Sequence, residues 1–324
     1  MPKNIKVLFL AAEAAPFVKI GGLADVAGSL PRALQSLSEE ETNGIKLDIR
    51  LAIPLHMVIR SEAATLRPVA NFSLARSGNE VNAQVFETRL EHLPVYFIAG
   101  DPINTSGSVY SANAAQDGEK YTFFSIAALE MTKHLDWTPD IIHVNDWHAA
   151  LASYALLLKR WDGGMTETKS VLTVHNLPFS GPDVTGRLAT YGLPLVSTDL
   201  PEWAHALPLP LGIWAADKIV AVSPSYADEM LTAEQGAGLE KFLAQRKDHL
   251  TGILNGIDTK SFDPANDEAL EANFTIDSLD ERAWNKIALQ QELGLAVDSD
   301  TPLFGIVSRM DTQKGIDLVF EALQ

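Results

Sequence analysis

Apolar runs of strand length recur along the chain, and segments with helical periodicity separate them. Many of these runs are continuous rather than alternating, as expected for strands that helices cover on both faces. The alternation of strands and helices predicts an α/β fold built on a doubly wound, Rossmann-like sheet. The predicted strands cover residues 5–13, 48–54, 83–88, 94–100, 140–146, 169–176, 217–224, 250–258 and 303–309.

Three features refine this scheme. Residues 118–135 and 147–161 carry the clearest helical patterns. The strands at 83–88 and 94–100 are separated by a short connection, which favours an antiparallel hairpin at one edge of the sheet. Pro31 falls inside the helix expected after the first strand, and because proline lacks a backbone N–H we predict a kink or a restarted helix near Ser29.

The carboxyl-terminal part of the sequence predicts a division into domains. We expect a first domain over residues 1–262, a linker with one helix over 263–300, and the start of a second α/β domain over 301–324. Gly294 follows the helix of the linker where a helix-ending glycine is expected. The last strand and helix are too short to enclose a core of their own, so we expect the chain to stop inside the second domain.

Composition narrows the function classes. The chain has 25 Lys and Arg against 42 Asp and Glu, a formal charge of −17, which argues against a nucleic-acid partner because phosphates would be repelled. It has no cysteine, which excludes disulfides and Cys-ligated metal sites and fits a cytoplasmic protein. The apolar stretch at 7–12 is shorter than a signal sequence needs, and no segment is long enough to cross a membrane.

Lys19, Gly21 and Gly22 follow the first predicted strand, at the expected start of a helix. Glycine lets backbone N–H groups approach an anion, the helix amino terminus carries about half a positive charge, and the lysine adds a full one. The spacing is neither that of a dinucleotide fingerprint nor that of a P-loop. A plain helix entry with an exposed lysine is the alternative interpretation.

Polar residues also end the strand at 140–146, where such sheets bind ligands. The histidines at 143 and 148 lack the spacing of a zinc-binding H-E-x-x-H motif. We therefore interpret Asp146 as a cap for the following helix and Trp147 as a core residue, in preference to a metal site.

The strand at 169–176 ends on His175 and Asn176, a pair suited to contacts with sugar hydroxyls or a leaving group. A histidine satisfied by backbone hydrogen bonds is the alternative. A helix start capped by Ser223 or Ser225 follows the next strand. Asn255 lies in a later strand-end turn that is equally compatible with a plain loop.

Arg309 and Lys314 lie five residues apart, across a turn that precedes the last helix. Both cations could converge on one diphosphate, since guanidinium and ammonium groups bind phosphate oxygens through charge-assisted hydrogen bonds. Two exposed cations on a loop are the alternative.

The order of these motifs is more specific than any one of them. Lys-x-Gly-Gly-Leu, Asp-Trp-His, Val-His-Asn, Val-Ser-Pro-x-Tyr, Asn-Gly-Ile-Asp and Ser-Arg-x-x-x-Gln-Lys-Gly together resemble the bacterial glycogen synthase and plant starch synthase family, from Ile5 to about Leu323. The resemblance implies a retaining glucosyltransferase of the GT-B architecture, in which two Rossmann-like domains face each other across a cleft. Such enzymes transfer glucose from ADP-glucose to the non-reducing end of an α-1,4-glucan, glycogen or starch, without metal or other cofactor.

The same resemblance places several residues at the donor. It implies that Lys19, Gly21 and Gly22 line the donor site and that Asp25 lies beside it. In such a site the lysine and the nearby amides stabilise the negative charge that develops on the departing diphosphate, the task that Mg²⁺ performs in metal-dependent transferases.

The remaining family positions concern the transferred glucose and the second domain. The resemblance implies that His175 lies close to the glucose and that its backbone carbonyl stabilises the sugar cation, while Asn176 and Asn255 match other positions in the cleft. Arg309 and Lys314 match the cations that hold the diphosphate. Catalytic roles are thereby implied for Lys19, His175, Arg309 and Lys314.

The chain also departs from the family. The Glu-x7-Glu motif and the nucleoside pocket of the family's second domain are not in this sequence. We therefore expect little or no synthase activity from this chain alone. Two alternatives stay open, a GT-B transferase that uses UDP-glucose or another acceptor and a non-catalytic glucan-binding remnant. A nicotinamide oxidoreductase is disfavoured because no G-x-G-x-x-G follows the first strand.

Overall fold

The computed structural model describes residues 3–59, 66–308, 310 and 314–323. The chain divides into two compact units, Met1–Gly256 and Ile257–Gln324. The first unit contains the sheet and both helices with the clearest sequence patterns. The second contains the linker helix and the last helix.

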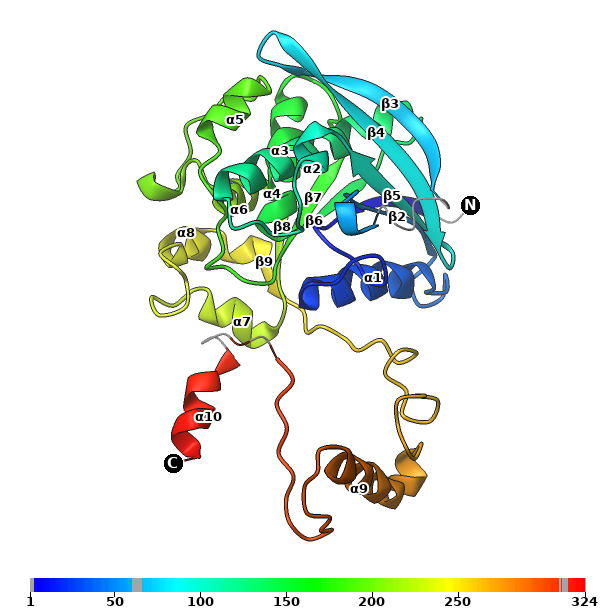
Figure 1. Ribbon diagram of the computed structural model, residues 1–324. Helices are drawn as coiled ribbons and strands as arrows, with labels where there is room; N and C mark the ends of the chain where they lie inside the picture. Colours follow the sequence, from blue (N-terminus) through cyan, green and yellow to red (C-terminus); the bar gives the residue numbers. More distant parts are fainter. Residues whose placement is uncertain (1–2, 60–65, 309, 311–313, 324) are drawn as a thin grey trace. The chain divides into compact units, whose positions relative to one another are not determined.

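A nine-stranded sheet forms the centre of the first unit, with the order β3-β4-β5-β2-β1-β6-β7-β8-β9 (Figure 1). In this order, every pair of neighbouring strands between β5 and β9 is parallel. The pairs β3–β4 and β4–β5 are antiparallel and form one edge of the sheet. The doubly wound α/β prediction is confirmed. The strands are β1 Lys3–Leu10, β2 Ile45–Pro54, β3 Arg67–Arg76, β4 Asn79–Leu90, β5 Leu93–Ala99, β6 Ile141–Asn145, β7 Lys169–Val174, β8 Lys218–Ala221 and β9 Leu250–Gly252.

Helices cover both faces of this sheet. Helix α1 lies on one face, and α3 and α4 pack together on the other (Figure 1). Among the described residues, no helix combines the length and the apolar character that crossing a membrane requires. The helices of the first unit are α1 Gly22–Gln35, α2 Asp101–Asn104, α3 Ala114–His134, α4 Asp146–Trp161, α5 Thr185–Thr190, α6 Pro208–Ala215, α7 Pro224–Glu229 and α8 Glu240–Gln245.

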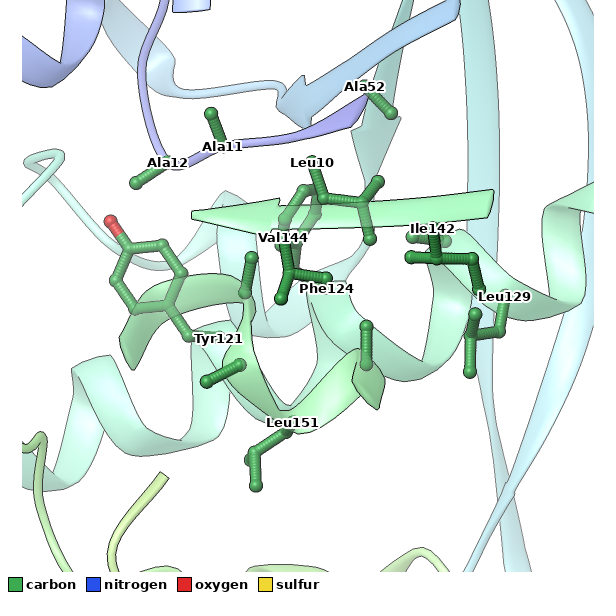
Figure 2. Close-up of a cluster of buried hydrophobic side chains, with 14 of the residues drawn as sticks. Leu10, Ala11, Ala12, Ala52, Tyr121, Phe124, Leu129, Ile142, Val144 and Leu151 are labelled. Atoms are coloured by element: carbon green, nitrogen blue, oxygen red, sulfur yellow. The ribbon is translucent and has the colours of Figure 1, made fainter. Parts of the chain in front are cut away.

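The core between the sheet and helices α3 and α4 explains why the central strands are apolar without interruption. Figure 2 shows Leu10 of β1 and Val144 of β6 beside Phe124 of α3, with Leu151 of α4 in the same cluster. All four side chains are buried. Burial of each such side chain contributes about 1.5–3 kcal/mol, so this layer fixes the central strands and the loops that leave them.

The edge of the sheet is partly as expected. The predicted hairpin is confirmed, because β4 and β5 pair antiparallel from Gln84↔Ala99 to Leu90↔Leu93. Strand β3 was not among the predicted strands. It alternates exposed polar residues with the buried Phe72 and Leu74, and this pattern of a half-exposed edge strand is weaker than a continuous apolar run.

Helix α1 contradicts the predicted restart of the helix near Ser29. It runs without interruption from Gly22 to Gln35 and contains Pro31. Proline removes one intrahelical hydrogen bond. Pro31 is buried together with Leu23 and other residues of this helix, so packing on the core outweighs that loss.

The second unit also differs from the predicted pattern. Residues 303–308 form no strand, and no strand among the described residues of this unit offers them a hydrogen-bonding partner. The predicted helix is present as α9, Arg282–Glu292, after the 3₁₀ helix Ile276–Glu281. Gly294 follows α9 with φ 66°, as predicted for a helix-ending glycine. Helix α10 spans Ile316–Ala322.

Gly28 fixes how closely α1 approaches the loop that follows β1. A Cβ atom at this position would overlap the carbonyl oxygen of Ala15, whose own N–H donates to Ala24 in the same helix at 2.9 Å. We predict that Gly28→Ala lowers the free energy of unfolding by about 1–3 kcal/mol, measured by urea denaturation, because the overlap forces backbone shifts.

Gly186→Ala is the matched control, since Gly186 lies in α5 and a Cβ there meets nothing within 4 Å. It should match or exceed the wild-type stability, by up to about 1 kcal/mol, because alanine favours helix. Equal stabilities of the two variants would contradict the close approach.

Candidate functional site

The carboxyl ends of β1, β6 and β7 lie side by side in the sheet. Leu10 pairs with Val144, and Val144 pairs with Leu172. The connection from β1 leads to β2 on one side, whereas the connection from β6 leads to β7 on the other. A sheet of this kind leaves a ligand-binding crevice where the chain changes direction, between β1 and β6.

Glu13 organises the glycine turn that follows β1. Its carboxylate is buried and accepts hydrogen bonds from the backbone N–H groups of Ile20 at 2.5 Å and Gly21 at 3.2 Å. It also accepts one from the hydroxyl group of Tyr110 at 2.9 Å. These bonds close the turn into a loop that delivers the chain to α1, where Gly21 is the N-cap residue without a side-chain cap.

The charges around this turn are mixed. Burial raises the pKa of the Glu13 carboxyl, against the effect of its three hydrogen bonds. Lys19 forms an ion pair with Asp25 at 2.8 Å, and the two side chains are 55% and 45% exposed. An exposed pair of this kind contributes only about 0–1 kcal/mol, so an incoming anion can compete with Asp25 for the lysine.

The fold does not itself require glycine at the start of α1. A Cβ atom at Gly22 would meet nothing within 4 Å, and one at Gly21 would come no closer than 3.5 Å to Glu13. Neither residue has a positive φ. This side of the turn is therefore open enough for a ligand to approach the backbone at the amino end of the helix.

Asp146 joins the ends of β6 and β7. It is the first residue of α4, and its φ is 53°. Its Oδ1 atom accepts hydrogen bonds from the N–H groups of His175 at 2.7 Å and Asn176 at 3.4 Å. The prediction that it caps its own helix is wrong, because its side chain binds the turn of the neighbouring strand. Burial raises the pKa of this carboxyl.

Asn145 fixes the ring of His175. Its amide Nδ2 donates to the carbonyl oxygen of Leu10 at 3.0 Å, so its Oδ1 faces His175 Nε2 at 3.0 Å as an acceptor. The imidazole therefore carries its proton on Nε2. Burial lowers the pKa of His175, which favours this neutral form. The ring of His175 is held by the side chain of Asn145, so the alternative of a histidine satisfied by backbone hydrogen bonds does not apply to the ring.

A buried ion pair supports the loop that carries Tyr110. Lys120 is fully buried and binds Asp117 at 2.7 Å, and its ammonium group also donates to Ser106 at 3.0 Å and to the carbonyl of Val109 at 2.6 Å. All three hydrogens of the ammonium group can thus be used, as a buried charge requires. This network holds the Tyr110 hydroxyl toward Glu13.

The histidines of β6 and of the first turn of α4 contact neighbouring side chains of the fold. His143 bonds the hydroxyl of Thr173 at 2.7 Å, and burial lowers its pKa to about 4. His148 packs against Trp147, Tyr110 and other rings, and burial lowers its pKa well below the usual value. No group of three His, Cys, Asp or Glu residues in the described ranges is placed to hold a metal ion.

The structure gathers part of the predicted site. The carboxyl edge of the sheet carries the residues of the glycine turn and of the histidine turn: Lys19, Gly21, Gly22, Asp25, His175 and Asn176. Asn255 is exposed beyond β9. Lys314 is exposed before α10 in the second unit, and Arg309 lies outside the described residues.

Sequence analysis did not single out Glu13 or Tyr110. A signal for Glu13 is its position directly after the apolar stretch at 7–12, because a carboxylate buried there needs hydrogen-bond partners. Tyr110 lies 97 residues away from it, and no local pattern links the two. The prediction that Ser223 caps a helix is confirmed, since its hydroxyl accepts the N–H of Tyr226 at 3.0 Å.

Comparison with known proteins gives consistent matches. Residues 6–245 match the family model of the starch synthase catalytic domain. Glycogen synthases of Streptococcus pneumoniae strains 70585 and P1031 are each 34% identical over 325 aligned residues, which cover 98% of this chain. The chain spans 66% of the length of these curated relatives.

One solved structure matches closely over the same extent. It is the catalytic domain of starch synthase IV from Arabidopsis thaliana bound to ADP and acarbose, with a TM-score of 0.86 and 30% sequence identity. The match covers 99% of this chain and 66% of that one.

The raised pKa of Glu13 predicts a pH-dependent effect of Glu13→Gln on stability. Between the usual value near 4.5 and the raised value, the folded protein keeps a proton that the unfolded chain has lost, so wild-type stability falls as pH rises. Glutamine does not titrate, so the variant does not lose stability in this way. Its stability relative to wild type should therefore increase with pH across this range, measured by urea denaturation at several pH values.

Glu41→Gln provides a control with the opposite sign. Hydrogen bonds from the backbone and side chain of Ser38 lower the pKa of the Glu41 carboxyl. The relative stability of this variant should decrease as pH rises through the lowered value. If Glu13→Gln shows the same slope as Glu41→Gln, the assignment of a buried, proton-retaining Glu13 is wrong.

Proposed function

Because the chain belongs to the starch synthase catalytic domain family, we propose that it supplies the amino-terminal half of a retaining glucosyltransferase that elongates α-1,4-glucan. The donor in this proposal is ADP-glucose, and the acceptor is the non-reducing end of a glycogen- or starch-like chain. We assign the reaction to the cytoplasm, which a sequence without cysteine fits.

The observation that carries the proposal is the open glycine turn beside Lys19. The room around Gly21 and Gly22 lets a diphosphate reach the backbone at the start of α1, and the partial positive charge of the helix favours an anion there. Lys19 lies nearby in a weak surface ion pair with Asp25, and a diphosphate can replace Asp25 as the partner of the lysine.

In the proposed reaction the bond between glucose and diphosphate breaks, and negative charge develops on the diphosphate. Lys19 stabilises that charge from the first unit, and Arg309 and Lys314 do so from the second. Each preorganised donor of this kind contributes about 2.7–4 kcal/mol to transition-state stabilisation. No step of this scheme requires a metal ion.

His175 acts on the sugar. Its peptide bond to Asn176 is trans, and the N–H of that peptide points to Asp146, so the carbonyl oxygen of His175 points away from this carboxylate. We assign this oxygen to the positive charge that develops on the transferred glucose. Asn176 follows in the same turn, and Asn255 is assigned to the same cleft.

The choice of nucleotide follows from the structural neighbour, which holds ADP. For the domains we keep a first domain over 1–262, a linker over 263–300 and the beginning of a second Rossmann-like domain over 301–324. In this arrangement the two domains must close on the donor, which expels water that would otherwise accept the glucose.

The experiment that tests the proposal is glucose transfer by the full-length protein to glycogen, with radiolabelled ADP-glucose and UDP-glucose as alternative donors. We expect label in the glucan that β-amylase releases as maltose, and a kcat/KM for ADP-glucose at least about tenfold above that for UDP-glucose. A preference for UDP-glucose would identify a different GT-B transferase, and glucan binding without transfer would identify a non-catalytic protein.

Lys19→Ala measured in the same assay tests the donor site. Loss of one preorganised donor to the departing diphosphate, about 2.7–4 kcal/mol, should lower kcat/KM by about 100- to 1000-fold. Lys133→Ala is the control, because Lys133 is 58% exposed and also forms an ion pair, with Glu130 at 3.0 Å, but lies on the last turn of α3. Equal effects of the two variants would contradict a role for Lys19 at the diphosphate.

A further inference from the structure

Tyr226 lies in the Val-Ser-Pro-x-Tyr motif, for which neither the sequence nor the proposed reaction supplies a role beyond a helix start. Its hydroxyl oxygen accepts the backbone N–H of Leu177 at 2.9 Å. We propose that Tyr226 is a positioning residue, which fixes the orientation of the turn His175–Leu177 and thereby the rate of glucosyl transfer. This inference rests on the proposed function of that turn.

The turn directs three consecutive N–H groups at two side chains. His175 and Asn176 donate to Asp146, at 2.7 and 3.4 Å, and Leu177 donates to Tyr226. The bond from Asn176 is long for an N–H···O contact. The second half of the turn therefore depends on the bond to Tyr226 more than on the one to Asp146.

A fixed N–H group also fixes the carbonyl group of the same peptide plane, because the two point in opposite directions. The N–H of Leu177 thus orients the carbonyl of Asn176, which accepts the N–H of Phe179 at 3.2 Å. Rotation of this peptide would disturb the adjoining peptide between His175 and Asn176, whose carbonyl is assigned to the glucose. The tyrosine acts through the backbone and is not itself a catalytic residue.

The backbone of Tyr226 is held by hydrogen bonds on both sides. Its N–H donates to the hydroxyl of Ser223 at 3.0 Å, and its carbonyl accepts the N–H of the buried Met230 at 2.9 Å. Strand β9 packs tightly against the start of α7, since a Cβ atom at Gly252 would overlap Ser223 and Pro224. The hydroxyl is therefore presented to Leu177 by rigid surroundings.

Tyr226→Phe removes the acceptor and leaves the ring. We expect kcat for glucose transfer to fall about tenfold with less than about a twofold change in KM for the donor, because a misaligned group acts on the transition state. In the 324-residue chain, the Leu177 amide should exchange its hydrogen at least about tenfold faster by NMR, because its hydrogen bond is lost.

Tyr154→Phe is the matched control. The Tyr154 hydroxyl also accepts a backbone N–H, that of Val196 at 3.2 Å, and donates to Pro194 at 2.6 Å, but neither bond involves the site. This variant should lose at least as much stability as Tyr226→Phe, by urea denaturation, and keep the wild-type kcat. Equal losses of kcat in the two variants would show a general structural effect and overturn the inference.

The two proposals fail in different ways. Wild-type transfer with unchanged kcat and unchanged Leu177 exchange in Tyr226→Phe overturns the positioning role and leaves the transferase intact. Absence of transfer in wild type, with faster Leu177 exchange in Tyr226→Phe, overturns the proposed function while supporting the hold of Tyr226 on the turn.

Discussion

The site depends on one constraint, that the backbone N–H groups of the turns beyond the strand ends need hydrogen-bond acceptors. Beyond β1 and β7 the sheet no longer supplies them. Glu13 accepts the amides of Ile20 and Gly21, and Asp146 accepts the amide of His175. The two carboxylates thereby shape two turns that share the carboxyl edge of the sheet.

The use of two carboxylates as hydrogen-bond acceptors places negative charge next to a proposed anion site. Burial raises the pKa of both Glu13 and Asp146, so the fold favours their neutral forms more than water does. Lys19 and the start of α1 face the same region with positive charge. A diphosphate there meets donors that the fold leaves open, while the carboxylates remain occupied by the backbone.

Much of this arrangement could be predicted from the sequence. Continuous apolar runs identified the central strands, and the ordered motifs pointed to Lys19 and His175 as candidate site residues. The contacts that shape the site could not be predicted, because they join residues distant in sequence, such as Tyr110 to Glu13 and Tyr226 to Leu177. Residues 303–308 show the opposite failure, since an apolar pattern forms a strand only when a neighbouring strand pairs with it.

The central claim is that the glycine turn after β1 is where the diphosphate of the donor binds. A titration of the isotope-labelled chain with ADP, followed by amide NMR shifts, tests it most directly. The account predicts that the largest shifts fall on Gly22 and Leu23, whose amides lie at the start of α1, beyond the two amides that Glu13 accepts. Saturable shifts confined to another part of the chain, with these two amides unmoved, would contradict it.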